Sequence, residues 1–151
     1  MANLYSQRTY DAALLLRAST TAITSTETGS LIVDLGVGLV DADLVVDVAT
    51  AKISATDEAY TFILEGSPDA LFGTAAHITI LGVFPIGSVA GVLTATGAPL
   101  GTLDAATGGR YLWPFRNERM GTTFRYVRLE TVIAGSSPST TFQAFIAKDD
   151  D

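Results

Sequence analysis

Residues 60–69 read Tyr60-Thr61-Phe62-Ile63-Leu64-Glu65-Gly66-Ser67-Pro68-Asp69, an apolar run that passes directly into turn residues. Tyr60, Phe62 and Leu64 share one parity, which is typical of a β-strand that buries one face. Gly, Ser, Pro and Asp are the residue types that build turns, so the strand is expected to end at 66–69. This stretch therefore predicts a short strand with one face in a hydrophobic core.

The same signature of short apolar runs between turn residues recurs along the chain. The further predicted strands are Leu31–Leu35, Leu44–Val48, His77–Val83, Val89–Leu93, Arg110–Trp113, Phe124–Ile133 and Phe142–Ile146. About eight short strands at near-regular spacing indicate an all-β sandwich or barrel. A long connection over residues 95–109 favours jelly-roll or Greek-key wiring over a meander. The predicted core is Tyr60, Phe62, Leu64, Val127, Leu129, Phe142 and Ile146.

Two parts of the chain differ in composition. Residues 1–30 are expected to form an N-terminal arm, which is either extended or a short helix over Tyr10–Ala18. Residues 19–30 are mostly Ser and Thr, which fits a solvated loop or an extended arm that adds a strand to a neighbour. Residues 31–151 are expected to form the sandwich, with an acidic tail at Asp149–Asp151.

Composition restricts the classes of function. The chain has 151 residues, no cysteine and a net charge of −7, which fits one domain without disulfides, zinc–cysteine sites or a cysteine nucleophile. An acidic chain is repelled by phosphates, so neither nucleic acid nor a membrane is an expected partner. The sequence has neither an apolar run of about 20 residues nor a signal-peptide pattern, so synthesis in the cytoplasm is expected.

The residues that carry acid–base chemistry are few. His77, the single histidine, has the parity of Thr79 rather than of its apolar neighbours, so it is predicted on the surface. Asp57, Glu58 and Glu65 could supply the paired carboxylates of a glycoside hydrolase, but solvated turn and strand positions explain them equally well. No catalytic residue is therefore predicted.

Candidate ligand-binding patterns are also weak. Asp41, Asp43 and Asp47 share a parity, but Val46 and Lys52 stand where an EF-hand calcium loop requires Gly and Glu. Charged positions at a strand edge, which discourage aggregation, are the preferred interpretation. Gly36-Val37-Gly38 lacks the third glycine of a dinucleotide fingerprint. The sequence thus predicts no metal and no cofactor.

A local cluster of arginine and aromatic residues occupies positions 110–128. This segment holds five of the nine basic residues, interleaved with large aromatic side chains. It is compatible with core aromatics whose neighbouring arginines pair with Glu118, Glu130 and other acids. A protein interface is the second interpretation, and stacking on nucleic acid is the least favoured of the three.

The predicted partner-binding residues come from the Thr-rich arm and the arginine–aromatic segment. They are Thr20, Thr21, Ile23, Arg110, Trp113, Arg116 and Arg119.

Several segments follow one another in a recognisable order. They are Ser19-Thr20-Thr21-Ala22, Ile32-Val33-Asp34-Leu35-Gly36, Leu44-Val45-Val46, Thr61 to Asp69, Leu71-Phe72-Gly73, Arg125-Tyr126-Val127-Arg128-Leu129 and Thr131 to Gly135. This order resembles the small cement (decoration) proteins of short-tailed bacteriophages, and the resemblance spans residues 18–147.

The resemblance implies a jelly-roll fold without enzymatic activity or cofactor. It implies a virion protein that sits on the exterior of the capsid, clamps neighbouring subunits of the major capsid protein and forms a dimer, trimer or other homo-oligomer. A carbohydrate-binding jelly roll with Trp113 as a stacking platform is the main alternative. A hydrolase that uses Glu58 and Glu65 is the third.

Overall fold

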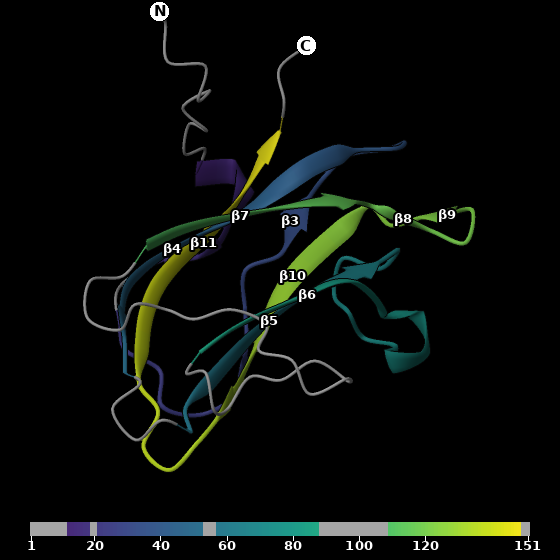
Figure 1. Cartoon of the computed structure of the whole chain (residues 1–151). Helices are drawn as coiled ribbons and strands as arrows, with labels where there is room; N and C mark the ends of the chain where they lie inside the picture. Colours follow the sequence, from purple (N-terminus) through teal and green to yellow (C-terminus); the bar gives the residue numbers. More distant parts are fainter. Residues whose placement is uncertain (1–11, 19–20, 53–56, 88–108, 149–151) are drawn as a thin grey trace, which may run out of the picture.

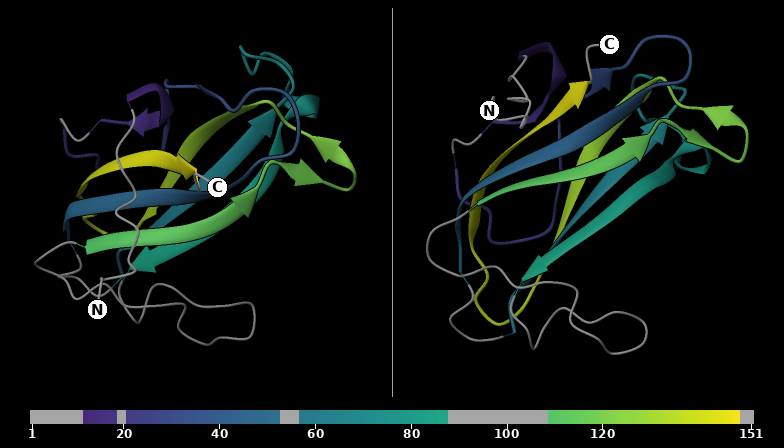
Figure 2. Two further views of the ribbon diagram at one scale, coloured as in Figure 1. Left: turned by 90° about the horizontal axis from the view of Figure 1, so that it is seen from above. Right: turned by 45° about the horizontal axis from the view of Figure 1, so that its top comes forward.

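Two antiparallel β-sheets pack face to face in the computed structural model, which describes residues 12–18, 21–52, 57–87 and 109–148 (Figure 1). Among these residues there is no α-helix; the helical turns are the 3₁₀ segments η1 (Ala12–Leu14) and η2 (Ala75–His77). The all-β sandwich expected from the strand pattern is therefore confirmed. Figure 2 shows the two layers from further directions.

The strands divide between the sheets in a fixed order. The first sheet runs β1 (Leu15–Arg17), β11 (Thr140–Lys148), β4 (Asp41–Ala51) and β7 (Gly109–Arg116). The second runs β2 (Glu27–Thr28), β10 (Tyr126–Ala134), β5 (Ala59–Ser67) and β6 (Thr79–Gly87), and β3 (Val33–Asp34) also pairs with β10. A separate hairpin joins β8 (Glu118–Arg119) to β9 (Thr122–Thr123).

Most successive long strands change sheet; β5 and β6 are the exception, because they pair as neighbours in the second sheet. The chain passes from β4 to β5, from β6 to β7 and from β10 to β11 by crossing between the layers. Each crossing places apolar side chains of one sheet against those of the other, because one parity of every long strand faces inward. The seven predicted core residues are all buried, and Phe62 meets Phe142 edge to face with 4.9 Å between the ring centroids. The prediction of the core is confirmed.

A second, smaller apolar cluster lies on the opposite face of the first sheet. Val45, Phe145 and Ala147 are buried there, with Leu15 packed against them. This explains why the middle of β4 is apolar at both parities, where a strand with one solvated face would alternate.

The described part of residues 1–30 belongs to the sandwich, which corrects the expectation of a separate arm. Residues 15–17 form strand β1 at the edge of the first sheet, and Leu16 and Ile23 are buried in the main core. Two alternatives were open for Tyr10–Ala18, a short helix and an extended segment. In the described part, residues 12–14 form a 3₁₀ turn and residues 15–17 are extended, so the short α-helix does not form there. The reason is tertiary packing. Extending along β11 gives residues 15–17 backbone pairing and buries Leu16, whereas an isolated short helix is only marginally stable.

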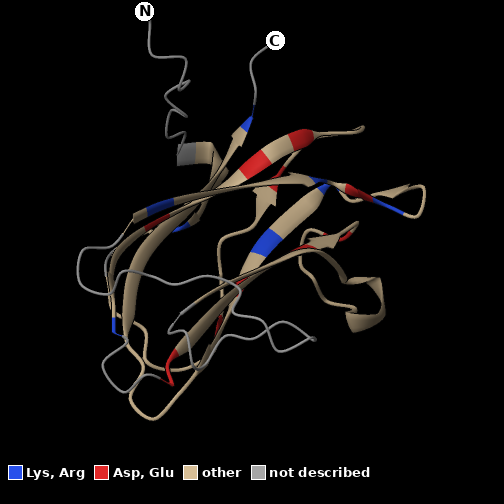
Figure 3. Ribbon diagram, in the orientation of Figure 1, with Lys and Arg blue, Asp and Glu red and all other residues tan. Residues whose placement is uncertain are grey.

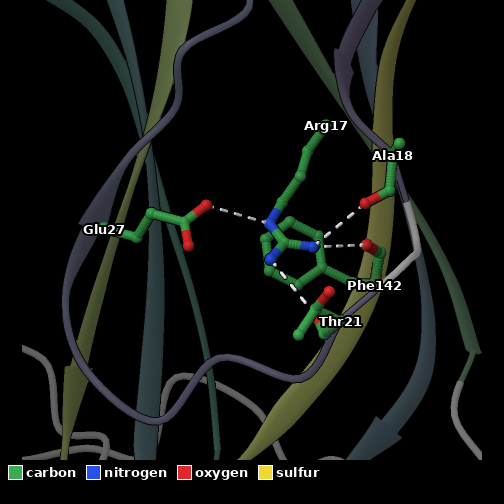
Figure 4. Close-up of polar contacts among 5 residues, drawn as sticks. All are labelled: Arg17, Ala18, Thr21, Glu27 and Phe142. Carbon is green, nitrogen blue, oxygen red and sulfur yellow. Dashed lines mark hydrogen bonds and ion pairs between the residues drawn. The ribbon is translucent and has the colours of Figure 1, made fainter.

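Arg17 ties the segment after β1 to the sandwich (Figure 4). Its guanidinium lies over the ring of Phe142, 4.6 Å from the centroid, and donates to the carbonyl oxygens of Ala18, Thr21 and Phe142 at 3.2–3.3 Å. It also pairs with the carboxylate of Glu27 at 3.3 Å. The Thr-rich loop is therefore held at both ends by one side chain.

Strand boundaries differ from the predictions at several places. Of Leu31–Leu35 only residues 33–34 pair, and His77 precedes β6 instead of beginning it. The predicted strand Val89–Leu93 and the acidic tail lie outside the described residues.

Candidate functional site

The arginines of β7 are paired with aspartates of β4, the neighbouring strand. Figure 3 marks the basic and acidic positions along the strands. Arg110 holds both carboxylate oxygens of Asp47 at 2.5 and 2.7 Å, and Arg116 holds those of Asp41 at 2.7 and 2.9 Å. The pKa of Asp41 is lowered by its hydrogen bonds with Arg116. Ion pairing of the arginines was one of the predicted interpretations, but the partners are aspartates directly opposite in register.

Two expectations about these acids need correction. β4 lies between β11 and β7, so Asp41 and Asp47 are on a central strand rather than at a sheet edge. Glu118 instead accepts a hydrogen bond from the backbone N–H of Gly121 within the β8–β9 hairpin. In the described ranges no three His, Cys, Asp or Glu side chains gather as a metal site.

The aromatic residues of β7 face the other way, into the gap between the sheets. The ring of Trp113 is nearly parallel to those of Phe84 and Tyr111, with centroid distances of 5.0 and 5.4 Å. These neighbours compete with any ligand for the faces of the indole. The structure thus separates Trp113 from Arg110 and Arg116, which the sequence had grouped together.

The structure does not bring the remaining predicted contact residues together into one surface. Thr20 is outside the described residues, Thr21 is exposed beside Arg17, and Ile23 is buried and bridges to Thr140 in the backbone pairing. Because Ile23 is buried in the folded chain, its side chain is not accessible to a partner. Arg119 lies in the β8–β9 hairpin and donates to the carbonyl of Ile80 at 2.7 Å.

The residues considered for hydrolysis do not form a pair. Glu58 is fully buried, contrary to the expectation of a solvated turn, and immediately precedes β5. Glu65 lies near the far end of β5 and pairs with Arg128 at 2.7 Å. Seven residues of strand separate the two by roughly 23 Å, whereas glycosidase carboxylates stand about 5–10 Å apart. His77 is exposed, as predicted.

One end of the sandwich presents apolar side chains that the sequence did not single out. Val37, Leu39, Leu71 and Met120 are 88%, 54%, 83% and 95% exposed. They belong to three connections that meet at this end: residues 35–40, residues 68–78 and the β8–β9 hairpin (Figure 1). These four side chains are called here the loop-end surface.

Asn117 joins two of these connections from inside. Its side chain is fully buried; Oδ1 accepts from the N–H of Val40 at 2.7 Å, and Nδ2 donates to the carbonyls of Gly38 and Phe124 at 3.0 and 3.1 Å. The backbone groups of Asn117 also bond to Val40 and Phe124. A single asparagine therefore fixes the loop 35–40 against the hairpin.

Two aspartates hold the backbone of the loops that carry Val37 and Leu71. Asp34 accepts two hydrogen bonds from Arg125 at 2.7 and 2.8 Å and one from the N–H of Gly36, and these bonds lower its pKa to about 2. Asp69 accepts from the N–H groups of Leu71 and Gly73, both at 3.0 Å, which lowers its pKa. The exposed tips are thus held by ordered loops.

Phe72 anchors the loop that carries Leu71. It is buried, has a positive φ of 51° and lies under the guanidinium of Arg128 at 4.4 Å. Leu71, its neighbour, is directed into solvent as a consequence. Sequence signals for this surface existed in Gly36-Val37-Gly38-Leu39 and Met120-Gly121, which set apolar residues between turn glycines.

Comparison with known proteins identifies no relative: no family model matches the chain, and no curated protein matches it significantly. Among the described residues no helix has the length and apolar character needed to cross a bilayer.

Proposed function

We propose that this chain is a structural virion protein that binds the outside of an assembled capsid and cements neighbouring major capsid subunits. The order of segments that resembles phage cement proteins motivates the proposal. Several of these segments lie in the framework, in β4, in β5 with its following turn, and in β10. In this role the chain acts as a homo-oligomer, without catalysis.

The jelly roll that accompanies this role is part of the proposal. Two sheets ordered β1-β11-β4-β7 and β2-β10-β5-β6 support it, because the chain alternates between the layers as two interleaved Greek keys require.

The observation that carries the proposal is the loop-end surface. Exposed Leu and Met side chains on rigid loops contribute nothing to the core, but they are suited to binding another protein. Because the loops are ordered by Asn117, Asp34 and Asp69 in the free chain, little conformational entropy is lost on binding. A ligand that binds only the assembled shell stabilises that shell, and bridging two subunits adds effective concentration.

Sedimentation with capsids tests this function. Empty shells of the major capsid protein from the same genome are mixed with the chain and pelleted. We expect saturable co-sedimentation, and decorated shells should withstand higher temperatures or chelator concentrations than bare shells. Equal disruption of bare and decorated shells contradicts the cementing role. Light scattering of the free chain measures the proposed homo-oligomer.

Carbohydrate binding gains no support from the site. A stacking platform requires an open ring face, and the faces of Trp113 are approached by Tyr111 and Phe84.

A further inference from the structure

Met120 stands at the tip of a hairpin in a backbone conformation that disfavours it. β8 and β9 pair through Arg119 and Thr122, which leaves Met120 and Gly121 as a two-residue turn. Their φ angles are 52° and 80°, both in the left-handed region. Two-residue hairpin turns with positive φ at both positions are of type I′, and they strongly prefer Asn-Gly. A Met in the first position opposes the local backbone preference.

Packing does not compensate for this cost. The side chain of Met120 is 95% exposed, so it gains no burial in the folded chain. The hairpin itself is braced by other groups: Arg119 donates to the carbonyl of Ile80, and Glu118 accepts from the N–H of Gly121. A residue that is unfavourable for its turn and unused by the core points to a function outside the chain.

The neighbours of Met120 share its exposure. Val37 lies between Gly36 and Gly38, both with positive φ, and Leu71 follows the Asp69 turn. Both side chains are more than four-fifths exposed. Three separate connections therefore place apolar tips at one end of the molecule.

We propose that Met120 is the main anchor by which the loop-end surface binds a capsid subunit, inserting into an apolar hollow of that subunit. This inference rests on the proposed cementing function and assigns its contact face. Met suits such a socket because its unbranched, polarisable side chain adapts to irregular apolar gaps. Leu71 and Val37 are further exposed apolar tips at the same end of the sandwich and would add to the contact.

A second copy of this chain is a poorer occupant. A hollow of about 310 Å³ along β4 and β7 is lined by Asp41, Asp43 and Arg116 together with Ala42, Pro114 and Phe115, so half of its lining residues are charged. A Met tip seated there would bury ionised groups to which it offers no hydrogen bond or charge.

Replacing Met120 separates binding from folding. Met120→Asn creates the preferred Asn-Gly turn, so the melting temperature should rise by about 2–4 °C. The same change should weaken binding to empty shells about tenfold or more. Met120→Leu keeps an apolar tip and should bind within about threefold of the unchanged chain. Val83→Thr, at an exposed position in the middle of β6, is the matched control and should leave binding unchanged.

Each outcome decides a specific point. Unaltered shell binding by Met120→Asn overturns the anchor and leaves the cementing function standing. A lower melting temperature for Met120→Asn also overturns it, because Met120 would then serve the fold. If Met120→Asn loses self-association but still binds shells, Met120 contacts a second copy of this chain instead of a capsid subunit. Failure of the unchanged chain to bind shells removes the cementing function, and the anchor with it.

Discussion

The interior of the sandwich and its loop end arrange the same residue types in opposite ways. Between the sheets, apolar side chains such as Phe62 and Phe142 are buried, whereas the ion pairs of β4 with β7 are exposed to solvent. At the loop end, polar Asn117 is buried while Leu71 and Met120 face solvent. Both regions are ordered, one by packing and the other by hydrogen bonds.

This difference teaches where to look for function when the interior carries no reactive groups that define a site. Burial from water explains the apolar residues of the interior, because it is the main favourable contribution to folding. It does not explain the exposed tips. A polar network beneath them holds each tip in place before any partner arrives, which is how a preorganised binding surface is built.

The largest effect is expected where packing alone provides the order. Phe62→Ala removes a buried ring that contacts Phe142 edge to face and Trp113 at 6.0 Å between centroids. The free energy of unfolding should fall by about 3–5 kcal/mol, measured by urea denaturation. A loss below about 1 kcal/mol would mean that the interior is not tightly packed and would break the comparison.

A smaller loss of stability, with a larger loss of function, is expected for Asn117→Ala. The change leaves the N–H of Val40 and the carbonyls of Gly38 and Phe124 without their partner. The free energy of unfolding should fall by about 2–3 kcal/mol, because buried polar groups lose their hydrogen bonds. Shell binding should weaken beyond what the unfolded fraction explains. Binding in proportion to the folded fraction would show that order at the loop end is irrelevant.

The smallest effect is expected in the dependence of stability on acidic pH. The pKa of Asp34 lies at about 2 in the folded chain because of its hydrogen bonds with Arg125 and Gly36, whereas its ordinary value is 3.8. A lowered pKa means that the stability Asp34 adds is complete above about pH 4 and is lost as the pH falls toward about 2. The melting temperature of Asp34→Asn should therefore fall less than that of the unchanged chain as the pH is lowered from about 4 toward about 2.

A matched acid at the other end sharpens this test. Asp57 accepts two hydrogen bonds from Ser136, and these lower its pKa. Asp57→Asn should also reduce the acid decline in thermal melts, but it should leave shell binding at pH 7 unchanged. Weaker binding by Asp57→Asn would show that the contact face extends beyond the loop end.

Alternation along the strands was sufficient to predict the fold class and the core. Tyr60, Phe62 and Leu64 are inward because parity is a local property. The strand ends at Ser67, inside the stretch 66–69 where its turn-forming residues predict an end. The outward direction of Arg110 and Arg116 follows from the same rule, since their parity differs from that of Tyr111 and Trp113.

What the sequence did not predict depends on distant partners. The pairing of Arg116 with Asp41 joins residues 75 positions apart, and Glu58 is buried although a charged residue before a strand is usually solvated. Exposure of Leu71 follows from the insertion of Phe72 beneath Arg128. No local pattern specifies these contacts. For the loop-end surface the only local signal was the apolar residues beside turn glycines at 36–39 and 120–121, which does not by itself predict exposure.

Hydrogen–deuterium exchange on free and shell-bound chain tests the central claim most directly. We predict that shell binding slows exchange in residues 36–40, 69–73 and 118–122, while the backbone of β7 over residues 109–116 exchanges as in the free chain. Protection confined to β7 would instead assign the contact to the arginine–aromatic segment. Protection at neither place would contradict the account of this chain as a cement that binds by its loop end.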